Sequence, residues 1–333
     1  ANMVDKTFTE KSAGGLQSMV INFADAFNAK TEYFYFNNVA LKITPDSIRT
    51  VSYDDINFFI PSLAKKPYDF TMRVFKEPFT ITERQEYRDR LEAIDKKEKM
   101  QNEDGSPVFT TTEIGQMKAD LDEWAQTYRW DVNWQGQREK DLWPILRIVR
   151  GCSNVLWERE QEAQRSKEEL TELEQAVIGA HFVNMISGIG RLCYRSNKGM
   201  MPVCPYFLED DIPDEKQATG GSGKSIIVKL VVGSAVHVLD VDMKRFVSVT
   251  DAKFELGKLS SEPYKYRVLH WEDKPKAFPM KYFYNMVTSG LTVERKMVDP
   301  VTFSADDAPK SVITCNYPLS DDDDSTVGRF PLV

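Results

Sequence analysis

A glycine-rich octet that ends in lysine and serine carries the most direct chemical signal in this sequence. Residues 218–225 read Ala-Thr-Gly-Gly-Ser-Gly-Lys-Ser, and an apolar run, residues 226–228, follows at once. Glycine tolerates the dihedrals that turn successive backbone N–H groups toward a phosphate. Lys224 would then contact the β- and γ-phosphates of a nucleotide, and the Ser225 hydroxyl would bind Mg²⁺. The alternative is a flexible Gly/Ser linker that happens to contain a lysine.

On the first interpretation, the octet binds ATP together with Mg²⁺, although Ala218 stands where the first glycine of this motif is usual. The candidate nucleotide-binding residues are Gly220, Gly221, Ser222, Gly223, Lys224 and Ser225.

A phosphate loop needs a second element, a buried strand whose acidic end holds Mg²⁺ and positions the attacking water. The run Val236–Asp240 ends in an acid, but a helix must fit between the loop and the next strand, so we interpret it as a neighbouring strand. The run Val268–Asp273 lies far enough along the chain to leave room for a helix, a strand and a connection. We therefore predict that Glu272 and Asp273 bind the metal and align water, with the division of roles left open.

Two residues near the end of the chain extend this set. Ser311–Asn316 is a short apolar run, and the amide of Asn316 could orient a water near the γ-phosphate, as sensor residues do in ring ATPases. The alternative is a strand closed by an asparagine turn. Arg329 follows an acidic loop, residues 321–324, and an arginine there could stabilise transition-state charge in a neighbouring subunit as an arginine finger.

The order of these elements resembles that of superfamily 3 helicases, in particular the helicase part of phage and plasmid primase-helicase proteins. That family combines a phosphate loop, an acidic strand, a β-hairpin motif and a strand ending in Asn within roughly one hundred residues. Residues 283–296 match the hairpin motif, and the resemblance implies that Arg295 and Lys296 contact single-stranded DNA in a central pore. One departure is the acidic pair, because the family often has Asp-Asp or Asp-Glu where this chain has Glu272-Asp273.

This resemblance implies an ATP-hydrolysing, ring-forming DNA helicase or translocase that acts in the replication of a phage, plasmid or mobile element. The implied partners are single-stranded DNA, further copies of the chain in a hexameric ring, and a primase or other replication protein. One alternative is a ring ATPase that packages DNA or remodels protein complexes without unwinding. Another is an assembly subunit in which the nucleotide is structural. Relatives usually continue beyond the position of Val333, so we expect a truncated ATPase core.

Composition sets broad limits on these classes. The chain has 333 residues, a net charge of −8 and 41% apolar residues, as expected for a globular protein of two or three domains. The negative charge argues against a broad basic surface for duplex DNA, although it allows a small basic channel. With no run of 18 apolar residues and no signal-like N-terminus, we expect a cytoplasmic protein (in the host cell if phage-encoded) that contacts no membrane. Four cysteines without a C-x-x-C pair argue against structural zinc.

The fold class expected from these elements is an α/β P-loop NTPase core, AAA+ like with a mainly parallel sheet. A mostly helical N-terminal region with a small β element precedes it. We place an accessory region at 1–150, a helical module at 151–205 and the ATPase core at 206–333.

Within these regions, β-formers predict a hairpin or meander in 31–60, and charge without Gly or Pro predicts a helix in 82–100. Residues 155–190 are expected to be helical throughout, with a capping box at Ser166–Glu169 and His181 as a core or interface residue. Four tryptophans are expected to pack in a core rather than stack on bases, namely Trp124, Trp130, Trp134 and Trp143.

Overall fold

The computed structural model divides the chain into two compact units, Ala1–Met72 and Arg73–Val333. It describes residues 30–56, 60, 64–72, 78–134, 144–195, 202–208, 223–244, 246, 252, 255–262, 265–276, 278–295, 298–316 and 333.

The first unit contains a three-stranded antiparallel meander. Its strands are β1 (Glu32–Tyr35), β2 (Ala40–Thr44) and β3 (Ser47–Val51), and the 3₁₀-helix η2 (Tyr53–Asp55) follows. Tyr33, Tyr35, Ala40 and Ile56 form its small core. The meander expected in 31–60 is therefore confirmed.

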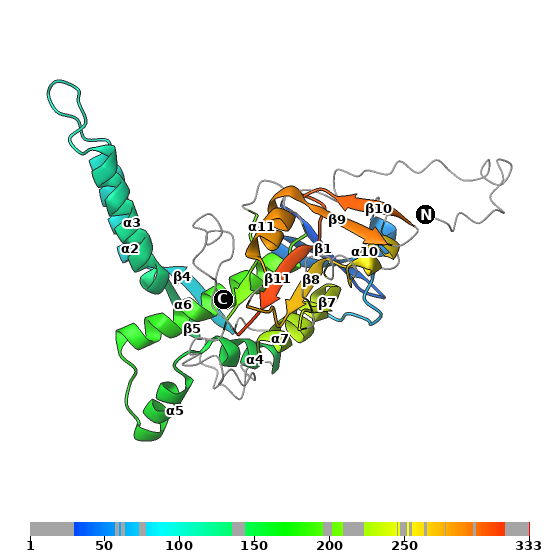
Figure 1. Cartoon of the computed structure of the whole chain (residues 1–333). Coiled ribbons are helices and arrows are strands. Elements are labelled where there is room, and N and C mark those ends of the chain that lie inside the picture. Colours follow the sequence, from blue (N-terminus) through cyan, green and yellow to red (C-terminus); the bar gives the residue numbers. More distant parts are fainter. Residues whose placement is uncertain are drawn as a thin grey trace, which may run out of the picture. The chain divides into compact units, whose positions relative to one another are not determined.

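Near the start of the second unit, two long helices connect two paired strands (Figure 1). β4 (Phe79–Glu83) pairs antiparallel with β5 (Trp130–Trp134), and α2 (Gln85–Glu98) and α3 (Thr111–Tyr128) connect them. The two helices pack through Tyr87, Ile94, Ile114 and Leu121, with Trp124 against that core. The helix expected in 82–100 is confirmed. Packing of Trp124 in a core is also confirmed. Trp134 packs as expected too, since its ring centroid lies 5.0 Å from that of Phe182. Trp143 lies outside the described residues.

Three helices follow, α4 (Pro144–Ser153), α5 (Trp157–Ser166) and α6 (Glu172–Cys193). The expectation of continuous helix over 155–190 is wrong, because Lys167 adopts a left-handed conformation with φ of 59° and ends α5. The capping box predicted at Ser166–Glu169 is also wrong. The Thr171 side chain accepts from the Glu174 backbone N–H, and the Glu174 carboxylate accepts from that of Thr171. Both features leave a short non-helical connection between α5 and α6.

Helix α6 is the long central helix of this unit. By length and composition it is long and apolar enough to cross a membrane, a test that core helices of soluble proteins also pass. It contacts α3, α4, β5, β11 and the helix that begins at Lys224. His181 lies on it, partly buried. The domain boundary expected near residue 205 stays a prediction, since α6 before that point packs against elements after it.

A four-stranded parallel sheet forms the centre of the C-terminal part (Figure 1). Its order is β6 (Tyr206–Phe207), β11 (Lys310–Thr314), β8 (Val268–Glu272), β7 (Val238–Asp242). A continuous helix over 224–235, made of α7 (Lys224–Ile226), the π-helical η5 (Ile227–Val232) and α8 (Gly233–Ala235), connects the loop region to β7. The short helix α10 (Gly257–Ser261) precedes β8, and α11 (Met280–Ser289) follows it. The chain is thus an α/β protein in this region, as parallel strands joined by helices require.

A β-hairpin lies between α11 and β11. Its strands are β9 (Leu291–Arg295) and β10 (Val298–Phe303), which pair antiparallel. The hairpin predicted in residues 283–296 is confirmed only in part, because β9 alone lies in that range. Residues 283–289 belong to α11, and β10 follows the predicted range. Leu291, Val293 and Phe303 are buried in the same apolar cluster as the sheet.

The two faces of the parallel sheet differ in character. Because side chains alternate along a strand, Leu269 and Trp271 of β8 lie on one face, and His270 and Glu272 lie on the other. The first pair belongs to an apolar cluster that also contains Phe283 of α11. The second face is approached by the helix 224–235, whose Lys229 contacts Glu272.

Candidate functional site

The carboxyl ends of the four parallel strands meet at one edge of the sheet, and three of the predicted residues lie there. Glu272 ends β8, Asp273 follows it, and Asn316 follows β11. The strand β6, which precedes the glycine-rich octet, ends at the same edge. In open α/β sheets this edge is where ligands bind. Backbone hydrogen bonds hold it together, from Met243 N to Glu272 O (2.9 Å) and from Cys315 N to Phe207 O (3.1 Å).

The described part of the octet begins at Gly223, directly before the helix. Gly223 has a left-handed φ of 85°, which favours glycine, and Lys224 opens the first helical turn. A Cβ on Gly223 would collide with Sγ of Cys152 on α4, so the backbone passes close to that helix. Burial raises the pKa of the Cys152 thiol. Gly220, Gly221 and Ser222 lie outside the described residues.

Each acidic residue of the predicted pair is bound to a lysine. Nζ of Lys229 lies 2.6 Å from Oε2 of Glu272, and Nζ of Lys244 lies 2.8 Å from Oδ2 of Asp273. Burial lowers the pKa of Lys229, but Glu272, with help from Asp240 and Asp273, outweighs it and leaves that pKa raised. Asp273 has φ of 53°, a left-handed conformation that few residues other than glycine adopt. The chain thus bends sharply where β8 ends.

A buried histidine joins three neighbouring strands beneath this edge. The side chain of His270 is fully buried, with Nδ1 2.7 Å from Asp240 Oδ1 and Nε2 2.9 Å from Thr314 Oγ1. Partial burial alone would raise the pKa of Asp240, but the hydrogen bond with His270 and the charge of Lys229 hold it below its usual range. The prediction that Asp240 belongs to a neighbouring strand is confirmed, although Asp240 lies in the middle of β7 and not at its end. Asp240 also takes part in the polar network of the site.

The other predicted residues are less completely placed. Asn316 is partly buried at the carboxyl edge, and none of the described residues forms a hydrogen bond with its side chain. Arg295 ends β9, where it pairs with Val298 across the hairpin. Lys296 and Arg329 lie outside the described residues, and so does the acidic loop before Arg329.

The oxygen donors predicted for Mg²⁺ are the hydroxyl of Ser225 and the carboxylates of Glu272 and Asp273. Hard oxygen ligands of this kind suit Mg²⁺. Ser225 lies one turn before Lys229 on the same helix, and Lys229 contacts Glu272 directly. The hydroxyl is therefore expected on the side of the helix that faces Glu272. In the described part of the chain, no group of three or more His, Cys, Asp or Glu side chains could by itself hold a metal ion.

No family model matches this chain, and a search of curated proteins finds no significant relative.

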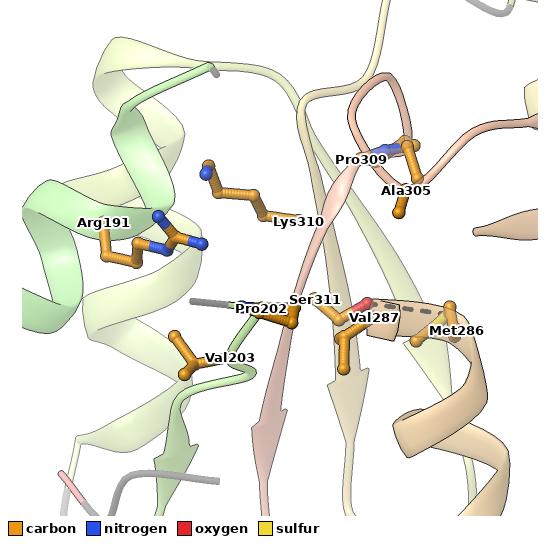
Figure 2. Close-up of a pocket in the computed structure, with 10 residues that line it drawn as sticks. Arg191, Pro202, Val203, Met286, Val287, Ala305, Pro309, Lys310 and Ser311 are labelled. Carbon is orange, nitrogen blue, oxygen red and sulfur yellow. Dashed lines mark hydrogen bonds between the residues drawn. The ribbon is translucent and has the colours of Figure 1, made fainter. Parts of the chain in front are cut away.

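A separate pocket lies at the opposite edge of the sheet, at the amino end of β11. Figure 2 shows Arg191 of α6 and Lys310 of β11 extending into the same space, above Pro202 and Val203. Burial lowers the pKa of the Arg191 guanidinium. Because Asn316 lies at the other end of β11, this pocket is distinct from the predicted nucleotide site.

Two residues of the network, Lys229 and His270, were not among the sequence candidates. The available signal for His270 was a polar side chain inside the apolar run Val268–Trp271. Lys229 carried a weaker signal, its position on the helix one turn after Ser225. Neither signal identifies a partner, because the partners lie on strands that only the tertiary fold brings together.

Proposed function

We propose that this chain is a P-loop ATPase of the superfamily 3 helicase type that moves along single-stranded DNA as a ring. The observation that carries the proposal is the shared carboxyl edge of β6, β11 and β8. The end of β6, which leads to the glycine-rich octet, lies at this edge, and so do Asn316 and the Glu272-Asp273 pair. A phosphate-binding loop, a polar sensor and acidic residues in such an arrangement suit nucleotide hydrolysis.

In this proposal the chain's own groups divide the work as follows. Backbone N–H groups of the octet and the first helical turn bind phosphate oxygens, and Lys224 adds a positive charge. Glu272 breaks its ion pair with Lys229 and aligns the attacking water. Asn316 contacts that water or the γ-phosphate. Mg²⁺ when bound supplies positive charge to the phosphate oxygens. The division of roles between Glu272 and Asp273 stays open.

The nucleotide site is tested by Lys224→Ala, with Lys97→Ala on α2 as a matched control lysine outside the site. We expect Lys224→Ala to abolish ATP turnover and Lys97→Ala to retain it. Turnover should be measured with and without single-stranded DNA, because a helicase-type ATPase is stimulated by its track. If the Lys224→Ala variant still hydrolyses ATP, the assignment of the nucleotide site to the octet is wrong.

The DNA contact is tested by the double substitution Arg295→Ala with Lys296→Ala. Both residues belong to the hairpin region that the family presents to DNA, so we expect weaker, less salt-dependent strand binding with unchanged nucleotide binding. Lys96→Ala with Lys97→Ala on α2 removes the same charge elsewhere and serves as the control. Undiminished DNA affinity in the hairpin variant would contradict the assignment. A strand-displacement assay then separates a helicase from a ring ATPase that packages DNA or remodels proteins.

A further inference from the structure

The fully buried His270 is hydrogen-bonded at both ring nitrogens, and this fixes its orientation. Its partners, Asp240 and Thr314, come from β7 and β11, the strands on either side of its own strand β8. With the proton on Nδ1, the ring donates to the Asp240 carboxylate and accepts from the Thr314 hydroxyl. The three side chains thus form one directional chain of hydrogen bonds across the sheet.

The packing of this face of the sheet does not require a polar side chain at position 270. Val268 and Val312 lie on the same face of the sheet as His270 and are fully buried. An apolar residue in place of His270 would fill the same kind of environment without burying a polar ring. A buried polar group costs free energy unless every partner is supplied, so a satisfied triad at this position calls for another role.

Each end of the chain of hydrogen bonds leads to a residue of the proposed site. Thr314 lies two positions before Asn316 on the same extended segment. The helix 224–235 contacts β7, the strand that carries Asp240, and its Lys229 binds Glu272 on the adjacent strand β8. The helix that follows the glycine-rich octet is therefore connected to the Asn316 strand through Asp240, His270 and Thr314.

We propose that Asp240, His270 and Thr314 form a positioning relay that places Asn316 according to the position of the helix 224–235. The proposal rests on the proposed nucleotide site. None of the three residues contacts substrate. When nucleotide displaces Lys229 from Glu272, the balance of charge at Asp240 changes, and the directional hydrogen bonds transmit that change to β11. Asn316 then reaches its working position only when the octet is occupied.

The decisive pair of variants is Thr314→Val and Thr314→Ser. Valine has the shape of threonine without the hydroxyl, whereas serine keeps the hydroxyl. We expect Thr314→Val to lower kcat for ATP hydrolysis about tenfold and to leave KM within about twofold, since misplaced groups reduce the chemical step. Thr314→Ser should restore kcat to within about threefold of the native value. Equal kcat in Thr314→Val and the native protein, or an equal loss in both variants, overturns the relay.

A second measurement follows the relay without turnover. Hydrogen exchange of the peptide covering 311–316 should slow when ATP and Mg²⁺ are added to the native protein, and this response should be lost in Thr314→Val. A native protein that hydrolyses ATP in a Lys224-dependent way but shows no response in 311–316 overturns the relay and leaves the proposed function standing. If the native protein neither binds nor hydrolyses ATP, the proposed function is wrong, and the relay that rests on it is wrong as well.

Discussion

The two faces of the parallel sheet are made by alternate residues of the same short strands, yet they are stabilised in different ways. On one face, Trp271 packs edge-on against the rings of Tyr282 and Phe283, at 5.9 and 5.3 Å between centroids. On the other, Glu272 and His270 are bound through ion pairs and hydrogen bonds. The apolar face supplies non-directional stability, and the polar face supplies directional contacts whose geometry a ligand can alter.

The largest expected effect is on the apolar face. Trp271→Ala removes a fully buried ring and leaves a cavity among aromatic neighbours, so we expect a loss of about 3–5 kcal/mol in the free energy of unfolding. Urea-induced unfolding followed by circular dichroism measures it. A loss below about 1 kcal/mol would show that this face is less tightly packed than its ring contacts indicate.

The next effect is on the polar face of the same strand. His270→Leu leaves the buried hydroxyl of Thr314 without its hydrogen bond, and we expect about 1–3 kcal/mol of destabilisation. Adding Thr314→Val should recover part of that loss, because replacing both partners by apolar groups removes the unsatisfied hydroxyl. A double-mutant cycle by urea unfolding provides the coupling energy. Strictly additive losses would mean that the two side chains do not interact.

This alternation also explains what the sequence could predict. The acid Glu272 and the amide Asn316 each follow an apolar run, so the ends of β8 and β11 could be located by pattern, whereas Asp240 lies in the middle of β7. The strand order could not, because the placement of β11 between β6 and β8 depends on pairing between distant segments. The Lys229–Glu272 and His270–Thr314 contacts depend on that order. Neither contact could therefore be predicted from the sequence, which gives only the residue types.

The break between α5 and α6 was missed for a different reason. Residues around Lys167 include neither Gly nor Pro, and local propensity favours helix there. Arg159 bonds Glu174 (2.8 Å) and also contacts Glu168, which joins α5 to the start of α6 across the turn. Tertiary contacts of this kind override weak propensity. They are invisible to a pattern that is read along one helix.

A smaller effect concerns pH. The pKa of Asp240 is lowered in the folded protein, so its interactions contribute stability above the unfolded pKa of about 4 and lose it as pH falls through the lower folded value. The stability difference between the native protein and Asp240→Asn should therefore be constant from about pH 7 to pH 5 and shrink below about pH 4. Urea unfolding across that range measures it. A difference that grows on acidification would contradict the sign of the shift.

The smallest effect is expected at the partly exposed ion pair. Lys229→Met should change the free energy of unfolding by less than about 1 kcal/mol, because such pairs gain little in water. Lys244→Met, at the more exposed pair with Asp273, is the matched control. The two variants should differ in ATP turnover rather than in stability, since only Lys229 also influences Asp240. Equal ATP turnover in the two variants would show that the contact of Lys229 with the polar face does not contribute to hydrolysis.

The π-helical turn over Ile227–Val232 marks where this helix can change its length by one residue. A π turn holds one more residue than an α turn, so removing a single residue there would leave an ordinary α-helix. Because the π turn already takes up the extra residue, Lys224 and Ser225 on its N-terminal side would keep roughly the same direction relative to the sheet. A one-residue deletion from an ordinary α turn would instead rotate every side chain before it by about 100°. The loss of one residue within this helix should therefore be tolerated in the π turn and not in the α turns on either side of it.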